Sequence, residues 1–175
     1  MTIAEQAWPA ARLGPLARLR AIAAGLPGVH LHEEVIDAAF DDVWRFVSDL
    51  ERTTTTFEPD VRSLRILERD AAHWKVRIRL APWLGALPLN LDVTMQDGWC
   101  WMISRPHLYV VGMAAEPLEG SPTATRYGHL EGVVLPTAPW ARAAAWPILG
   151  ISRWRHRVHV PRDVARIAAH VTDAD

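Results

Sequence analysis

The chain has 175 residues, a formal net charge of -1 and a sequence pI of about 6.7. This length fits one domain, which can bury roughly 70% of the surface of its unfolded chain. The near-neutral charge argues against a nucleic-acid partner, because no basic surplus is present to release counterions from phosphates. The single cysteine, Cys100, excludes an internal disulfide and a cysteine-based zinc site. It fits a reducing cytoplasm, which is the location we expect.

The first 28 residues predict a helical arm. Apolar residues recur there at helical spacing, at Leu13, Leu16, Leu19, Ile22, Ala23 and Leu26. Arginines interrupt every apolar run, so the segment is neither a signal peptide nor a membrane span, and we expect no stable membrane insertion. We expect residues 1–28 to pack on a domain of residues 29–175 or on a second copy of the chain, as in a homodimer.

A strand over Val29 to Ile36 is predicted to lead directly into an amphipathic helix from Phe40 to about Glu51. The helix places its apolar residues on one stripe: Phe40, Val43, Trp44, Val47 and Leu50. Asp41 and Asp42 lie in its first turn, where their charges complement the positive end of the helix dipole. A short helix or turn should follow, around Thr53 to Phe57.

Beyond that point the apolar residues alternate with polar ones, which predicts half-buried antiparallel strands. Trp74, Val76, Ile78 and Leu80 show this alternation, and the same period recurs as far as Leu135. With Val61 to Arg69 the chain has seven predicted strands. After Pro136 a helical period returns and predicts a long C-terminal helical region, which Pro147 and Pro161 should start or kink.

Three short motifs support a family resemblance. They are the strand-to-helix segment Val35–Leu50, the segment Phe57-Glu58-Pro59-Asp60-Val61-Arg62-Ser63, and Thr123-Ala124-Thr125-Arg126 before the last strand. In this order the chain resembles the START-like (SRPBCC, polyketide cyclase/dehydrase) superfamily from Val29 to Val171, with Ala39 at the position of a family proline. The resemblance implies an α+β helix-grip fold, in which a seven-stranded curved antiparallel sheet wraps a long C-terminal helix and encloses a ligand cavity.

Polar residues occupy every second position of the first and last strands. His30, His32 and Glu34 share one face of the first strand, and Tyr127, His129 and Glu131 share one face of the last. The two strands are neighbours in the resembled fold, whose hydrophobic positions favour both sets as inward. Composition alone leaves an outward, solvated arrangement open. An inward cluster suits proton transfer or a metal ion, but His-x-His spacing on a strand is too common to assign a metal.

We therefore expect a protein that binds a hydrophobic, aromatic or polyketide-like small molecule and catalyses its cyclisation or dehydration without a cofactor. No phosphate-binding loop, dinucleotide glycine pattern or zinc-protease motif is present. The candidate catalytic residues are His129, Glu131 and Tyr127, followed by His32 and Glu34.

Nine tryptophans suggest a wall for a flat ligand, although core packing is the alternative for each of them. The expected ligand contacts are Trp74, Trp99, Trp101, Trp154 and Met113. Two other classes of function stay open. One is a non-catalytic carrier or sensor of a hydrophobic molecule or lipid, and the other is a membrane-peripheral partner protein that uses the N-terminal arm.

Overall fold

The computed structural model describes residues 13–82, 88–105, 108–134 and 139–173, so residues 1–12 of the expected arm lie outside the described residues. The elements in chain order are α1 (Pro15–Gly25), β1 (Val29–Ile36), α2 (Phe40–Ser48), α3 (Leu50–Phe57), β2 (Val61–Asp70), β3 (His73–Leu80), β4 (Pro88–Gln96), β5 (Trp99–Arg105), β6 (Tyr109–Leu118), β7 (Ser121–Val133) and α4 (Pro139–Thr172). The seven expected strands are confirmed.

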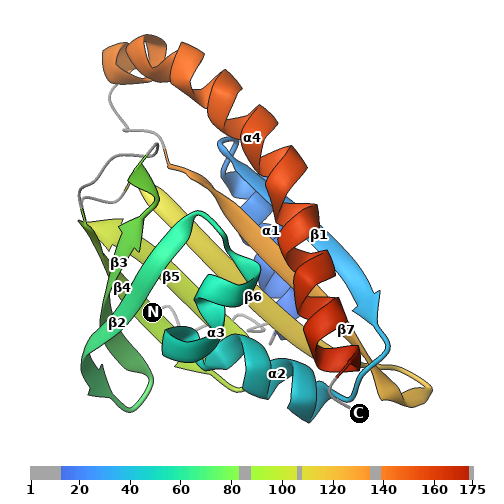
Figure 1. The fold of residues 1–175 in the computed structure, drawn as a ribbon. Coiled ribbons are helices and arrows are strands. Elements are labelled where there is room, and N and C mark those ends of the chain that lie inside the picture. Colours follow the sequence, from blue (N-terminus) through green and yellow to red (C-terminus); the bar gives the residue numbers. More distant parts are fainter. Residues whose placement is uncertain (1–12, 83–87, 106–107, 135–138, 174–175) are drawn as a thin grey trace, which may run out of the picture.

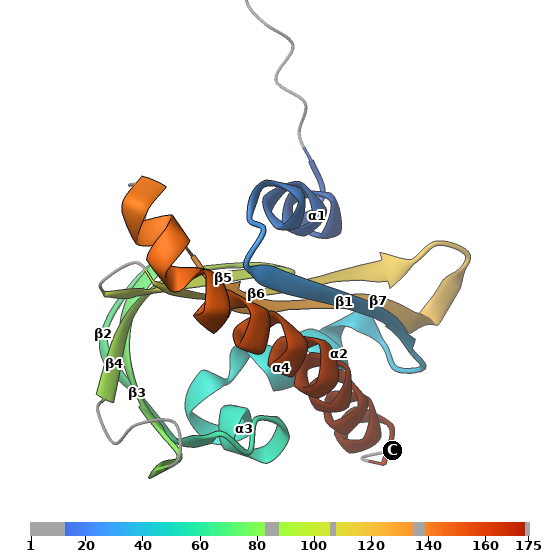
Figure 2. The same cartoon turned by 90° about the horizontal axis from the view of Figure 1, so that it is seen from above.

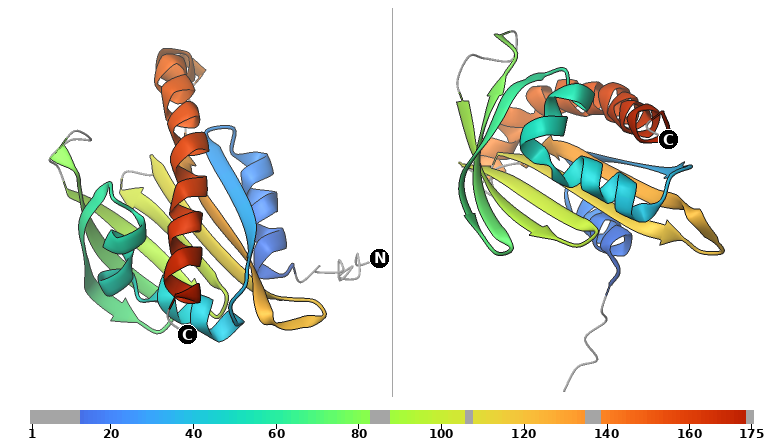
Figure 3. Two further views of the ribbon diagram at one scale, coloured as in Figure 1. Left: turned by 45° about the vertical axis from the view of Figure 1, so that its right-hand side comes forward. Right: turned by 60° about the horizontal axis from the view of Figure 1, so that its bottom comes forward.

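The strands form one antiparallel sheet in the order β1-β7-β6-β5-β4-β3-β2, so the first strand of the chain pairs with the last. The sheet curves, and α4 lies along its concave side together with α2 and α3 (Figure 1 and Figure 3). This is the expected helix-grip arrangement. Seen from above, α1 lies alone on the opposite, convex side of the sheet (Figure 2).

The main core fills the space between the concave side and the three helices. Val43, Trp44 and Val47 form the buried stripe of α2, as the sequence predicts. On β3 the alternation is strict, with Trp74, Val76 and Ile78 buried and the residues between them exposed. Burying each such side chain stabilises the fold by roughly 1.5–3 kcal/mol, so this layer fixes the curvature under which the site lies.

β7 is the strand that is covered by helices on both faces of the sheet. Its odd-numbered residues from Tyr127 to Glu131 face the concave side, and Gly128, Leu130 and Gly132 face the convex side. All of these residues are buried because α4 covers one side and α1 covers the other. A polar residue on the concave side of β7 is therefore removed from bulk solvent and needs partners within the protein.

α4 runs from Pro139 to Thr172 as one helix, so neither Pro147 nor Pro161 ends it. Val160, Val164 and Ile167 are fully buried on the face toward the sheet. This packing holds the helix together at Pro161, where the missing N–H removes one backbone hydrogen bond. None of the helices in the described ranges is long and apolar enough to cross a membrane.

Candidate functional site: an apolar cavity that ends in a buried polar cluster

A cavity of about 490 Å³ lies between the concave side of the sheet, α3 and α4. Apolar side chains of the sheet form most of its wall: Val61, Leu64, Ile78, Leu80, Leu89, Leu91, Met102, Val111 and Val133. The polar lining residues come from α3 and its C-terminal end, from β6 and β7, and from α4: Thr54, Glu58, Asp60, Tyr109, Glu131, Arg155, His156, His159 and Asp163. A largely apolar wall with a few convergent polar groups is typical of a small-molecule site.

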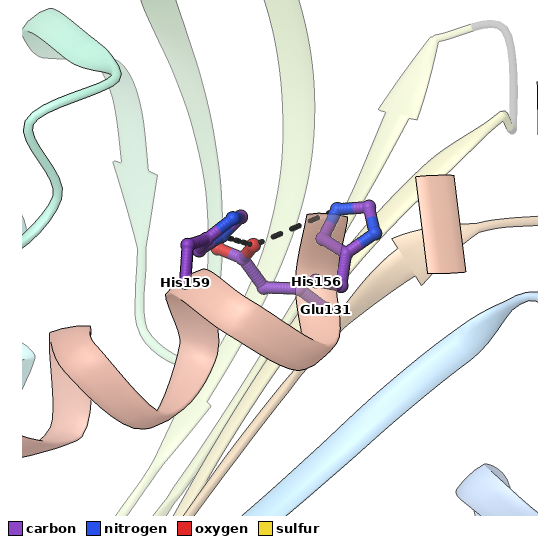
Figure 4. Close-up of side chains that lie close together, drawn as sticks. All are labelled: Glu131, His156 and His159. Atoms are coloured by element: carbon purple, nitrogen blue, oxygen red, sulfur yellow. Dashed lines mark hydrogen bonds and ion pairs between the residues drawn. The ribbon is translucent and has the colours of Figure 1, made fainter. Parts of the chain in front are cut away.

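Glu131 of β7 is the centre of the polar lining. One carboxylate oxygen, Oε2, lies 2.5 Å from Nε2 of His159 and 3.8 Å from Nε2 of His156. The other, Oε1, lies 3.4 Å from Nε2 of His129, which is also 3.6 Å from Oε1 of Glu58. We call Glu58, His129, Glu131, His156, His159 and Asp163 the polar cluster. Figure 4 shows Glu131 between the two histidines of α4.

A line of hydrogen bonds leads from the core to the cavity through this cluster. The hydroxyl of Tyr127 lies 3.2 Å from Nδ1 of His129. If Tyr127 donates this bond, Nε2 of His129 carries the ring proton and donates to Glu131. Glu131 in turn accepts a hydrogen bond from His159, which lines the cavity. His129 and Tyr127 thus lie behind Glu131 and orient it.

The two neighbouring carboxyl groups differ in charge because their partners differ. Burial raises the pKa of Glu131, but the hydrogen bonds from His129 and His159 outweigh it and hold that pKa well below its ordinary value. Burial and the charge of Glu131 raise the pKa of Glu58 well above its ordinary value. The two pKa values are shifted in opposite directions, which favours Glu58 as the proton donor of the pair and Glu131 as the acceptor.

The other groups at this end of the cavity respond to the same charge. Burial lowers the pKa of His159, but its bond to Glu131 outweighs this and leaves the pKa raised. Burial and the charge of Glu131 raise the pKa of Asp163 to about 6. Burial and Glu131 also raise the pKa of Tyr109 well above its usual value, so its hydroxyl stays protonated.

Three buried polar atoms in the cavity lining have no hydrogen-bond partner among the described residues. They are Oγ1 of Thr54, Nδ1 of His159 and Oδ2 of Asp163. Buried polar atoms are nearly always hydrogen-bonded in folded proteins, and an unsatisfied one costs about 1–3 kcal/mol. A bound molecule that carries polar groups can supply these partners, so the polar end of the cavity is suited to such a ligand.

Of the five expected catalytic residues, the structure brings Tyr127, His129 and Glu131 together. The strand register places His32 opposite His129 and Glu34 opposite Tyr127, as the expected pairing requires. The side chains of His32 and Glu34 nevertheless contact each other at 3.3 Å, are about one third exposed or more, and do not line the cavity. We correct the expectation for these two, because β1 is an edge strand and the cavity lies over β2 to β7.

The expected aromatic ligand contacts of β5 lie on the opposite side of the sheet. Cys100 and Met102 point to the concave core, so Trp99 and Trp101 point to the convex side, where they pack in the cluster under α1. Arg18 of α1 lies over the ring of Trp99 at 5.5 Å. The side-chain period of a strand explains this correction, since neighbouring residues always face opposite ways.

The other expected contacts also do not line the cavity. Trp74 is a core residue whose indole N–H donates to the carbonyl of Ala71, and Met113 is buried in the same core. Trp154 is 70% exposed on α4. Trp74 therefore fits the alternative of core packing, whereas Trp154 lies on the surface.

Sequence reasoning predicted Glu131 and missed the other eight residues of the polar lining: Thr54, Glu58, Asp60, Tyr109, Arg155, His156, His159 and Asp163. The basic run of α4, Arg153-Trp154-Arg155-His156-Arg157-Val158-His159, is of a kind that more often forms the solvated face of a helix than a contact for an anionic ligand or lipid surface. His156, His159 and Asp163 are spaced by three and four residues, which places them on one side of a helix, and this spacing could have identified them. Glu58 gave no comparable signal beyond its place before Pro59.

Comparison with known proteins supports the fold. No protein-family model and no curated protein sequence matches the chain. Among solved structures, the chain is similar to the Zhui aromatase/cyclase from Streptomyces sp. R1128, with 15% identity, a TM-score of 0.62, and coverage of 82% of this chain and 93% of that one. It is also similar to a START superfamily protein from Mycobacterium smegmatis, with 14% identity, a TM-score of 0.58, and coverage of 84% and 99%.

A third similar structure is norcoclaurine synthase from Thalictrum flavum in complex with dopamine and hydroxybenzaldehyde. It has 16% identity, a TM-score of 0.56, and coverage of 84% of this chain and 87% of that one. Likeness at this level of identity defines the fold and not the reaction. The chain has the START-like helix-grip fold, as the sequence motifs imply.

Proposed function

We propose that this protein binds a hydrophobic, aromatic or polyketide-like molecule and catalyses its cyclisation and dehydration by acid-base chemistry without a cofactor. The observation that carries the proposal is the buried Glu131, which lies at the polar end of an apolar cavity. The carboxyl group of Glu58, whose pKa is raised, and the imidazole of His159 lie beside it. A base and an acid held side by side at the end of an apolar cavity suit proton transfer to and from a carbonyl compound.

In the proposed reaction, Glu131 removes a proton from a carbon between two carbonyl groups of the bound molecule. The resulting enolate carbon attacks a second carbonyl of the same molecule, and that oxygen takes a proton from His159 or Glu58. His159 or Glu58, which lost its proton in the first step, then removes a further proton from the carbon next to the new hydroxyl. Glu131 gives the proton that it took up to this hydroxyl, which leaves as water, so that each residue returns to its starting state. The cavity contributes by holding the chain folded, so that the reacting carbons meet.

Tyr127 and His129 act as positioning residues in this proposal. Neither lines the cavity, and their hydrogen bonds fix the side chain of Glu131 from behind. Thr54 and Tyr109 line the cavity and can donate to polar groups of the ligand. A cytoplasmic location stays a prediction.

A non-catalytic carrier of a hydrophobic molecule is the second candidate. The continuous apolar wall formed by β2 to β6 favours it, because such a wall binds a flat molecule without any chemistry. Both candidate functions require saturable binding of the ligand, but only the enzyme would convert it to a product.

The proposal is tested with a linear poly-β-ketone and protein treated with a chelator, by following the absorbance of the aromatic product. We expect turnover by the wild type and a loss of about 10²–10⁴-fold in Glu131→Gln, which keeps the shape but loses the base. Glu34→Gln is the matched control, since Glu34 is partly exposed and outside the polar cluster. Binding without turnover would select the carrier, and equal turnover by both variants would remove Glu131 from the reaction.

Ligand polarity is tested by calorimetry with an aromatic compound and its hydroxylated analogue. We expect the hydroxylated compound to bind more tightly by a factor of roughly 10 or more, because its hydroxyl meets the polar cluster. Thr54→Val removes one unpaired hydroxyl from the lining at nearly constant shape and should reduce this preference. Equal affinities for both compounds would show that the polar end does not contact the ligand.

A further inference from the structure

Two histidines of α4 and one glutamate of β7 converge on a single point of the cavity wall. His156 and His159 are one helical turn apart, and each directs Nε2 toward Oε2 of Glu131 (Figure 4). The ligand atoms of the three residues all lie within 4.8 Å of one another. Because they come from two elements that pack together, the fold itself holds them in place.

The spacing of these atoms suits a transition-metal ion. Zinc binds imidazole nitrogen and carboxylate oxygen at about 2.0–2.2 Å in a tetrahedral arrangement, so two ligand atoms of one ion lie about 3.3–3.6 Å apart. The separation of 3.8 Å between Glu131 and His156 is slightly longer than this spacing, and the 2.5 Å contact between Glu131 and His159 is shorter. Binding an ion therefore requires His156 to approach Glu131 and the contact between Glu131 and His159 to open. Two histidines and one glutamate, with a further position open to a cavity, are a ligand set of catalytic zinc sites.

Asp163 provides a second, independent observation. Its side chain is 1% exposed, and its Oδ2 accepts no hydrogen bond from the described residues. This oxygen lies 3.5 Å from Nε2 of His159, one helical turn away. Arg166 pairs with the other oxygen of Asp163, Oδ1, at 2.8 Å, so Oδ2 is the oxygen that is left without a donor. A buried oxygen without a donor, close to the same histidine nitrogen, leaves room for a further partner at this point.

We propose that Glu131, His156 and His159 bind a divalent transition-metal ion of the zinc class, with Asp163 beside it and its open position toward the cavity. The inference goes beyond the proposed reaction, which needs no ion. A bound ion would occupy Oε2 of Glu131, and Glu131 is the base in that reaction. The ion-bound and ion-free forms are therefore alternative states of one site.

Another group of potential ligands, Glu58, His129 and Glu131, shares the same glutamate. It offers only one imidazole, and Nδ1 of His129 already contacts the hydroxyl of Tyr127. His129 is fully buried behind Glu131 and leaves no open position toward the cavity. The group with two histidines from α4 is therefore the one we assign.

The test is a titration of chelator-treated full-length protein with Co²⁺, followed by its visible ligand-field absorption and then by displacement with Zn²⁺. We expect one equivalent of Co²⁺ to bind. His156→Ala and His159→Ala should each weaken binding by at least tenfold, because even residues around the ligands of metal sites change affinity by 10–100-fold. A parallel melting experiment should show that Zn²⁺ raises the melting temperature of the wild type and not of either variant.

Two further variants keep the assignment falsifiable. His73→Ala removes an exposed histidine of β3 and should leave Co²⁺ binding unchanged, and His129→Gln should retain the ion. Absence of a one-to-one Co²⁺ spectrum would overturn the inference, and so would a spectrum lost in His129→Gln but kept in His156→Ala. The readout uses no organic ligand, so failure to bind Co²⁺ leaves the proposed reaction standing, and failure to bind an aromatic compound leaves the metal site standing.

Discussion

At the scale of residues, the site depends on a buried negative charge that its neighbours stabilise. Glu131 is fully buried, and an isolated carboxylate there would take up a proton instead of staying charged. His129 and His159 supply the hydrogen bonds that keep it ionised. The free energy of this arrangement therefore depends in part on two residues that do not line the cavity, His129 and the Tyr127 that contacts it.

We expect Tyr127→Phe to lower the free energy of unfolding by about 1–3 kcal/mol, because Nδ1 of His129 would lose its contact with the Tyr127 hydroxyl while staying buried. Urea denaturation measures this change. If the hydroxyl positions Glu131, the same variant should also reduce turnover while ligand affinity stays the same. Unchanged stability and unchanged turnover would show that the line of hydrogen bonds from the core does not act on the site.

The sequence predicted two of the six residues of the polar cluster. The period of β7 and the family motifs placed His129 and Glu131 inward, and the register with β1 followed from the fold. The partners on α4 were missed because arginines between them made the whole segment look solvated. The alternation along β5 places Trp99 and Trp101 on the face opposite to Met102, but the sequence alone does not show which face is inward; in the structure Met102 is inward.

At the scale of elements, α1 packs closely on the convex side of the sheet, because glycines of the sheet lie opposite two of its leucines. A Cβ at Gly112 would lie 2.5 Å from Cδ1 of Leu19, and a Cβ at Gly128 would lie 2.7 Å from Cδ2 of Leu16. Both leucines thus fill space that only glycine leaves open. The side chain of Glu116 accepts a hydrogen bond from the backbone N–H of Leu16 at the start of the helix.

We expect Leu19→Ala to lower the free energy of unfolding by about 2–5 kcal/mol, because Leu19 is fully buried against this side. Leu13→Ala is the matched control: Leu13 is 44% exposed, and its loss should change stability by less than about 0.5 kcal/mol. Thermal or urea unfolding compares the two. Equal effects would mean that α1 does not contribute to the folded domain.

The elements were easier to predict than the ends of the helices. Strand alternation and the stripe of α2 depend on local periodicity, which tertiary packing reinforces here. The continuity of α4 through Pro161 depends on packing against the sheet, which the local pattern does not contain. For the same reason the sequence left open whether the arm packs on the domain or on a second copy, whereas α1 packs on the domain.

At the scale of the whole molecule, the curved sheet separates two apolar layers with different roles. In the convex layer under α1, leucine and tryptophan side chains pack closely over glycines of the sheet. The concave layer is incompletely filled and leaves the cavity, whose polar end is the cluster around Glu131. The central claim is that a hydrophobic molecule binds on the concave side and not elsewhere.

An NMR titration of protein with labelled isoleucine, leucine and valine methyl groups tests this claim most directly, with a hydroxylated polycyclic aromatic compound as the ligand. We predict saturable shifts of the methyl signals of Ile78, Leu91 and Val111, which line the cavity, and none for Leu16 and Leu19 on the convex side. Shifts confined to Leu16 and Leu19, or no saturable shift at the three cavity residues, would contradict the account.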